Sequence, residues 1–271
     1  MARDQNPDEQ AHSANLTSRI FSDLRRQILK GELAAGDRLP GERELAQQYD
    51  TNRNTLREAV RRLEQIRLVT VRHGQGVTVT DFRRTGTLEL LAPLIETEPD
   101  LGELTHIVED LLPARLLFME FATRLAVRRA TESDCQYLQD ITDLLVASFE
   151  RGDRVVIAHG FHRWVDALVD ASHSQAIRWV ANPFLELYRD LIDRFPALWV
   201  LDPGFPDLLR SLMQAFREGN EEDALATTRQ YYERVDSELL RLLDALLSLR
   251  RRAAARGADP SQVVVPAGGD E

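Results

Sequence analysis

The chain has 271 residues and a formal net charge of −10, with 43% hydrophobic and 29% charged residues. This composition is ordinary for a globular protein in water, and the length allows two domains. A single cysteine, Cys135, excludes an internal disulfide framework, and the polar first 15 residues do not form a secretory signal. No apolar run is long enough to span a membrane, so we expect a cytoplasmic protein without a membrane partner.

The charge is distributed unevenly along the chain. Residues 14–84 hold 14 basic and 9 acidic side chains, a net charge of +5. The remaining residues hold 20 basic and 35 acidic side chains, a net charge of −15. A basic N-terminal module suggests a polyanionic partner, which the acidic remainder repels.

The N-terminal third is predicted to form a small helical module. Apolar residues recur there at the three- and four-residue spacing of helices that bury one face. The predicted elements, in chain order, are a helix at 16–30, an extended piece at 36–40, a helix at 41–49 and a helix that follows Asn52. Asn52 is expected to cap the last of these helices, and Gly31 is a plausible end for the first.

A β-hairpin is predicted at residues 67–80. Its two arms alternate with β-branched residues, and Gly74 and Gly76 mark the turn between them. Helix, short strand, helix, turn, helix and hairpin is the order of a winged helix-turn-helix. A small helical domain with an incidental hairpin is the alternative, and the polar, arginine-rich start of the third helix argues against it.

The rest of the chain is predicted to be almost entirely helical. A linker helix is expected within residues 83–100, and the helices beyond it are expected near 101–129, 132–150, 153–172, 175–195, 205–218 and 221–252. Short connections between them predict antiparallel neighbours in a bundle. The predicted fold class is therefore mainly α, with a winged helix-turn-helix at 14–82 and an all-α bundle at 101–254. Residues 1–13 and 255–271 are expected to be disordered.

A resemblance to a known family rests on the stretch RLPGERELAQQYDTNRNTLREAVRRLEQIRLVTVRHGQGVTV at 38–79. It resembles the winged helix-turn-helix of the GntR family of bacterial repressors. The shared features are LP-x-ERELA, then NR-x-T-x-REA, then a hairpin that closes in GQG-V. Gly41 stands where a serine or alanine is common in the family, and Asn52 replaces a serine that would also cap the helix.

The resemblance implies that the third helix enters the major groove of DNA with its first residues facing the base edges. Arg53 and Arg57 lie four residues apart on one helix face, and each can contact a guanine or clamp a phosphate. Asn54 and Thr55 can contact a base edge or a phosphate at the same end. Solvated surface arginines are the alternative interpretation of this pattern.

Two further parts of the module resemble DNA contacts of the family. Arg43, in the second helix, resembles the second main contact. His73, Gly74 and Gly76 resemble the tip of the wing, which inserts into a groove in the FadR-type branch. A mobile loop residue is the alternative for His73.

The C-terminal half resembles the helical effector domain of the FadR-type branch. The resemblance rests on LLPARLLFMEFATRLA at 111–126 and on AFREGNEEDALATTRQYY at 215–232. The arginine of the first segment points into the effector pocket in relatives, so Arg115 is the candidate contact for an acidic group of an effector. An ion pair of Arg115 with Glu109, Glu120 or a carboxylate of another helix is the alternative.

Many relatives hold a metal ion in this bundle with one aspartate and three histidines. Here His162 matches the first histidine, but Ala158, Leu209 and Tyr231 occupy the other three positions. Because an open metal site takes three protein ligands, we expect no metal and no other cofactor, and we interpret His162 as a pocket or packing residue. A metal site formed by His159, His162 and His173 with Asp153 or Asp166 is the alternative.

Because it lacks these metal ligands, the sequence resembles the part of the branch that binds long-chain acyl-CoA without a metal. Tyr188 and Tyr231 fall at positions that match this subgroup, and they are candidate effector contacts. Aromatic residues at the edge of the core are the alternative interpretation of both. Tyr232, Val235 and Leu239 replace residues that line the CoA end of its pocket. A small carboxylate is therefore the alternative effector.

These observations predict a dimeric transcription regulator, acting as a repressor, that reads an inverted repeat in double-stranded DNA and responds to a small-molecule effector. The remote alternatives are an enzyme with a DNA-binding appendage and an architectural DNA-binding protein. The sequence has no phosphate-binding glycine loop and no G-x-S-x-G motif, so we expect no catalytic residues. A bundle of this length exceeds what dimerisation needs, which favours a sensor.

Overall fold

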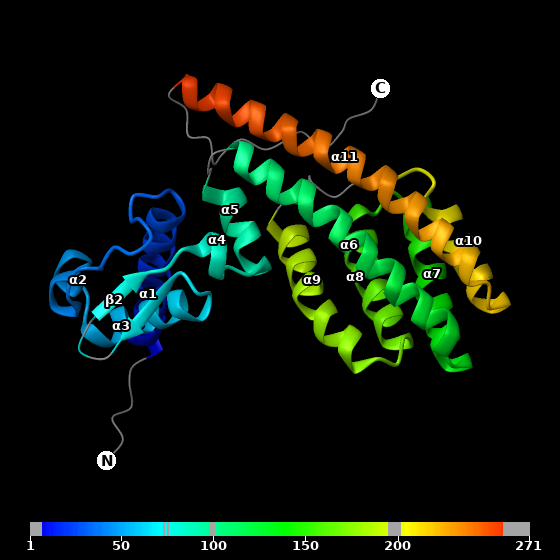
Figure 1. Cartoon of the computed structure of the whole chain (residues 1–271), viewed down its shortest axis with the longest axis horizontal. Helices are drawn as coiled ribbons and strands as arrows, with labels where there is room; N and C mark the ends of the chain where they lie inside the picture. The colour runs from blue at the N-terminus through cyan, green and yellow to red at the C-terminus, as the bar shows by residue number, and fades with distance from the viewer. Residues whose placement is uncertain (1–6, 73, 75, 98–100, 195–201, 257–271) are drawn as a thin grey trace, which may run out of the picture. The chain divides into compact units, whose positions relative to one another are not determined.

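The computed structural model describes residues 7–72, 74, 76–97, 101–194 and 202–256. The chain separates into two compact units, Met1–Pro99 and Asp100–Glu271. The first unit contains helices and a two-stranded antiparallel sheet, and the second contains only helices among its described residues (Figure 1). The predicted class, mainly α with a β-hairpin near the N-terminus, is confirmed.

Helix α1 (Pro7–Leu29) opens the first unit and begins earlier than the spacing of its apolar residues predicts. Residues 7–13, which we expected to be disordered, are helical. Glutamate, glutamine and alanine in this stretch favour a helix, and proline is accepted at a first helical position. At the other end, Gly31 has a φ of +76°, in keeping with the expected stop.

Helices α2 (Glu42–Gln48) and α3 (Arg53–Gln65) form the helix-turn-helix. Asn52 caps α3 as predicted, because its side-chain oxygen accepts a hydrogen bond from the backbone N–H of Thr55 at 2.9 Å. The apolar stripes of α1 and α3 face each other, and their buried residues include Ile20, Leu24, Ile28, Leu56 and Leu63. This packing fixes α3 with its polar side outward.

The phenol of Tyr49 ties the end of α2 to α1. Its hydroxyl donates a hydrogen bond to Asp23 over 2.7 Å. Burial and this hydrogen bond raise the pKa of Tyr49 to about 12, so the phenol stays protonated at neutral pH.

The wing consists of strands β1 (Val69–Arg72) and β2 (Gly76–Val79), paired with Val69 opposite Val79. The extended piece predicted at 36–40 joins them, since the backbone N–H of Leu39 donates to the carbonyl of Val77 over 2.9 Å. Gly74 and Gly76 have φ values of +74° and +87°, which side chains with a Cβ atom rarely adopt.

The predicted linker helix is divided into short pieces: α4 (Phe82–Thr85), the 3₁₀ turn η1 (Leu88–Leu90) and α5 (Leu91–Thr97). Gly86, with an extended backbone, ends α4. Helix α5 packs on α1, where Glu96 and Arg25 form an ion pair at 3.0 Å and Leu94 and Ile95 are buried. The linker therefore belongs to the first compact unit.

The second unit is a helical bundle, and its elements follow the predicted ranges closely: α6 (Leu101–Arg129), α7 (Glu132–Glu150), α8 (Arg154–Ala171), α9 (Gln175–Arg194), α10 (Phe205–Glu218) and α11 (Glu221–Ala255). Helix α11 lies along α6, and α8 packs against α6, α7 and α9 (Figure 1). The core contains large buried side chains such as Phe161, Trp164 and Phe205. In the described part of the chain, no helix combines the length and apolar character needed to cross a membrane.

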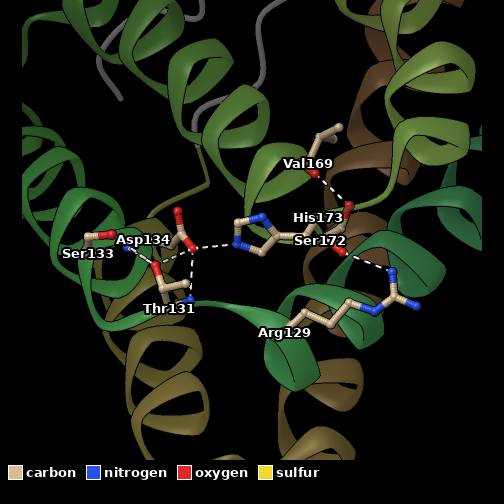
Figure 2. Close-up of polar contacts among 7 residues, drawn as sticks. All are labelled: Arg129, Thr131, Ser133, Asp134, Val169, Ser172 and His173. Carbon is tan, nitrogen blue, oxygen red and sulfur yellow. Dashed lines mark hydrogen bonds and ion pairs between the residues drawn. The ribbon is translucent and has the colours of Figure 1, made fainter.

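A polar cluster joins two turns of the bundle (Figure 2). Thr131 and Asp134 form a capping box at the start of α7, and His173 Nε2 lies 2.8 Å from the carboxylate of Asp134. Beside them, Arg129 donates to the backbone carbonyl of Ser172 over 3.2 Å. Although partial burial opposes it, hydrogen bonds from Thr131 and His173 lower the pKa of Asp134.

Candidate functional site

The start of α3 and the neighbouring part of α2 present the basic residues predicted to contact DNA. Arg43, Arg53, Asn54 and Arg57 are all exposed. Within the described residues, neither Arg43 nor Arg53 lies within ion-pair distance of a carboxylate. Their guanidinium groups are therefore available to an external anion at a helix N-terminus, where the backbone N–H groups also favour negative charge.

Arg57 differs from the other two arginines because it is engaged by Glu42, the first residue of α2. Its Nε lies 3.0 and 3.1 Å from the two carboxylate oxygens, and a terminal nitrogen lies 2.9 Å from one of them. The hydrogen bond with Arg57 lowers the pKa of Glu42 in spite of slight burial. Sequence reasoning missed this contact, since 15 residues separate the partners and helical spacing reports only neighbours on one helix.

Thr55 is placed less favourably for DNA than we expected. Its side chain faces the core, with 4% of the residue exposed, and only its backbone N–H takes part in the cap with Asn52. The position continues the inward stripe of Leu56 and Ala59, so helical phase explains the burial. A direct contact of the Thr55 hydroxyl with a base is therefore disfavoured.

The wing provides the other predicted contacts. Gly74 and Gly76 lie at the turn between β1 and β2, both exposed and both with positive φ. His73 lies outside the described residues, so its predicted contact remains a prediction. The glycines shape the turn and leave its backbone open to close approach by a ligand.

In the second unit, a series of contacts between aromatic rings and a guanidinium connects the four residues predicted to bind an effector: Arg115, His162, Tyr188 and Tyr231. We call His162, Tyr188, Phe161, Tyr231 and Tyr232 the aromatic cluster. Successive ring centres in that order lie 6.0, 6.4, 5.5 and 5.2 Å apart. Arg115 completes the series, with its Cζ atom 4.6 Å from the ring centre of Tyr232. Residues from α6, α8, α9 and α11 thus meet in one part of the bundle.

Arg115 is not an unengaged cation in this structure. Its Nη2 atom donates to a carboxylate oxygen of Asp236 on α11, 121 residues away. Glu120, one of the partners considered from the sequence, instead binds Arg229 at 2.6 Å. The alternative interpretation of Arg115, an ion pair with another helix, is therefore the arrangement present here, and Asp236 was missed because sequence patterns do not pair distant helices.

The interior position of the aromatic cluster raises the pKa values of its phenols. Burial is the main cause for Tyr188 and Tyr231, whose pKa values lie well above the ordinary range. Burial also raises the pKa of Tyr232 to about 12, although Arg115 opposes the shift. These phenols are neutral at physiological pH, so they can donate hydrogen bonds without adding negative charge.

The residues present do not fit the metal site of the resembled branch. Three of the four ligand positions are occupied by buried core residues: Ala158, Leu209 and Tyr231. The ring nitrogen Nε2 of His162 lies 3.0 Å from the backbone carbonyl of Leu185, and Nε2 of His159 lies 3.8 Å from a carboxylate oxygen of Asp193. Across the described ranges, no group of three or more metal-ligating side chains is assembled.

Comparison with known proteins agrees with this arrangement of two units. Residues 16–79 match the family of bacterial regulatory proteins of the gntR type, and residues 110–234 match the FCD domain. The transcriptional regulator Mce2R of Mycobacterium tuberculosis is 30% identical over 83% of this chain and 91% of its own length.

A fatty acid metabolism regulator protein of Vibrio parahaemolyticus is 33% identical over 75% of this chain and 85% of its own length. Among solved structures, a protein of Listeria monocytogenes called Lar, which controls expression of the agr system, is 17% identical with a TM-score of 0.53. That alignment covers 83% of this chain and 97% of Lar, and it supports the fold alone.

Proposed function

The chain belongs to the GntR family of bacterial transcription regulators and carries an effector-binding FCD domain, and we propose that it is a repressor that binds an inverted-repeat operator as a homodimer. We further propose that an acidic effector, a long-chain acyl-CoA or a small carboxylate, changes its affinity for the operator.

The observation that carries the DNA-binding proposal is the exposed basic start of α3. Arg53 and Arg43 face outward without a carboxylate at ion-pair distance in the described structure, while the apolar side of α3 is buried against α1. A guanidinium at this end of a recognition helix can donate two parallel hydrogen bonds to a guanine. The exposed backbone of the wing at Gly74 and Gly76 can also approach a groove.

The effector proposal rests on the aromatic cluster and Arg115. An arginine beside buried rings offers a cation for an acidic head group and apolar surface for the rest of a ligand. The relative named a fatty acid metabolism regulator protein supports a lipid-derived effector. Tyr232, Val235 and Leu239 replace residues that line the CoA end of the pocket in the acyl-CoA-binding subgroup, which favours a small carboxylate. Both classes of effector are therefore tested.

The test is fluorescence anisotropy of the purified protein on DNA from directly upstream of its own gene, at fixed salt because phosphate contacts make affinity steeply salt-dependent. Specific binding that palmitoyl-CoA releases is the expected result. An Arg53→Ala variant should bind the same DNA about ten- to a hundredfold more weakly, the cost of one bidentate base contact.

The outcomes separate the parts of the proposal. Specific binding that ignores palmitoyl-CoA keeps the repressor and directs the search to small carboxylates. Equal binding by Arg53→Ala and the parent protein would refute the assignment of α3 as the recognition helix. If the parent protein prefers no DNA sequence over a scrambled duplex, the proposed function is wrong.

A further inference from the structure

The guanidinium of Arg115 lies at the edge of the aromatic cluster, with only 20% of its side chain exposed. One terminal nitrogen donates to Asp236, and the face of the guanidinium covers the ring of Tyr232. The Nε atom is buried and has no hydrogen-bond partner among the described residues. Because a guanidinium carries five N–H donors in a fixed fork, Asp236 satisfies only part of what Arg115 offers.

Asp236 lies one helical turn after Tyr232 on α11, and its side chain is 17% exposed. Burial raises the pKa of this carboxyl group, and the ion pair with Arg115 opposes the shift. Arg115 is the only hydrogen-bond donor to its carboxylate within the described part of the chain. The carboxylate of Asp236 is therefore partly desolvated, and a single hydrogen-bond donor holds it in position.

A second ion pair on α11 provides a contrast. Arg234 binds Asp202 at 2.9 Å, but 43% of its side chain is exposed. Asp202 also accepts a hydrogen bond from the backbone N–H of Gly204 over 2.6 Å, so it shapes the start of α10 as well. Asp236 has no second contact of this kind in the described structure, and it can leave Arg115 without uncapping a helix.

We propose that Asp236 is an internal competitor for the acidic group of the effector. In the effector-free protein its carboxylate occupies the guanidinium of Arg115, and an effector binds by displacing it. This inference rests on the proposed function and makes it more specific. The favoured ligand carries a carboxylate or phosphate that engages two donors of Arg115, including the buried Nε, which a single oxygen of Asp236 leaves unused.

The competition sets a selectivity rule for the site. A neutral ligand cannot compensate Arg115 for the loss of Asp236, because a buried cation left without a partner is strongly unfavourable. An anion of equal charge restores the pair and adds a hydrogen bond. Asp236 therefore lowers the affinity for every anion while it selects against uncharged ligands.

The test uses sulfate as a minimal divalent anion and follows thermal unfolding by tryptophan fluorescence. All three tryptophans, Trp164, Trp179 and Trp199, belong to the second unit, so the signal reports on the unit that contains Arg115. Sulfate is titrated at constant ionic strength, and its general stabilising effect is measured from variants that lack the proposed site. Palmitoyl-CoA is titrated in a second series.

The variants are Asp236→Asn, the matched control Asp202→Asn and the double variant Arg115→Met with Asp236→Asn. We expect Asp236→Asn to bind sulfate at least tenfold more tightly than the parent, a change of about 1.4 kcal/mol. Asp202→Asn should respond as the parent does. The double variant should show only the general effect, because the cation is gone.

An unchanged sulfate affinity in folded Asp236→Asn overturns the inference. If Asp236→Asn and Asp236→Ala both fail to fold while the double variant folds, the pair is purely structural and the inference is again wrong. These results are distinguishable from failure of the proposed function, which is decided by operator binding of the parent protein and involves no change at Asp236.

Discussion

At the residue scale, three exposed arginines of the first unit differ in what they can offer to DNA. Arg43 and Arg53 have no carboxylate at ion-pair distance in the described structure, whereas Arg57 is bound by both oxygens of Glu42. Exposed ion pairs of this kind add little stability, because water and salt screen them. We therefore expect the Arg57–Glu42 pair to affect DNA binding more than stability, since Glu42 neutralises a guanidinium on the proposed DNA-contacting surface.

Replacement of Glu42 by glutamine should release Arg57 to a phosphate. We expect stronger binding to nonspecific DNA and a log–log salt dependence steeper by about one unit, as one more phosphate contact would give. The measurement is anisotropy on a random duplex at several salt concentrations. The double variant Glu42→Gln with Arg57→Ala is the control and should behave like Arg57→Ala. A loss of binding in Glu42→Gln would show instead that Glu42 positions Arg57 for its contact.

Asp134 gives the second unit a pH-dependent contribution to stability. Its folded-state pKa is lowered by hydrogen bonds, so its contribution is complete above the unfolded pKa of about 3.9 and is lost as the pH falls through the folded value. Asp134→Asn should reduce the unfolding free energy by about 1 kcal/mol at pH 7, the typical value of a helix cap. The difference from the parent should shrink below about pH 4.

Urea unfolding followed by tryptophan fluorescence at several pH values measures this effect. Asp140→Asn is the matched control, since Asp140 lies on the same helix and accepts a hydrogen bond only from the side chain of Gln136 in the described structure. It should change stability by a few tenths of a kcal/mol at most. A pH-independent loss in Asp134→Asn would contradict the assigned cause.

At the scale of elements, the periodicity of apolar residues predicted the helices well, because one-sided burial is a local property of the sequence. The caps were also predictable, as Asn52 shows. The division of the linker was not, since α5 is held by contacts with α1 that no local pattern contains. The same reason applies to the candidate effector site: the motifs singled out Arg115 and Tyr231 as candidates, but the ion pair of Arg115 with Asp236 depends on how distant helices pack.

The wing turn depends on backbone that only glycine adopts easily. Gly76 has a φ of +87°, and a Cβ atom there would meet no other atom within 4 Å, so the cost of an alanine is conformational alone. Gly76→Ala should destabilise the first unit by about 1 kcal/mol and weaken operator binding. Gly41→Ala is the control, because Gly41 has a φ of −57° and equal space.

Circular dichroism during urea unfolding measures the stability of the first unit in Gly76→Ala. Tryptophan fluorescence identifies the unfolding transition of the second unit, so the two transitions can be told apart. Gly41→Ala should be neutral or slightly stabilising, since alanine restricts the unfolded chain. Equal stability of the two variants would show that the wing turn relaxes to another conformation.

At the scale of the whole molecule, the proposed homodimer needs a face on which two copies meet. Two helices of the second unit carry large exposed apolar residues: Leu117 and Phe121 on α6, and Trp179 and Val180 on α9. The rings of Phe118 and Phe184 stack at 5.6 Å and hold these two helices together. Because exposed apolar side chains of this size are candidates for a protein–protein interface, we propose that α6 and α9 form the face on which two copies meet.

A charge in this face should separate the two copies without unfolding either. We expect Phe121→Glu to halve the mass measured by light scattering, with a tryptophan melting transition that stays cooperative, because Phe121 is 51% exposed and contributes little to the core. Leu144→Glu, at a residue 45% exposed on α7, should leave the mass unchanged. A monomer engages one half-site at a time, so operator affinity should fall about a hundredfold in Phe121→Glu while binding to a single half-site is retained. A dimer that survives this charge would place the interface on another face.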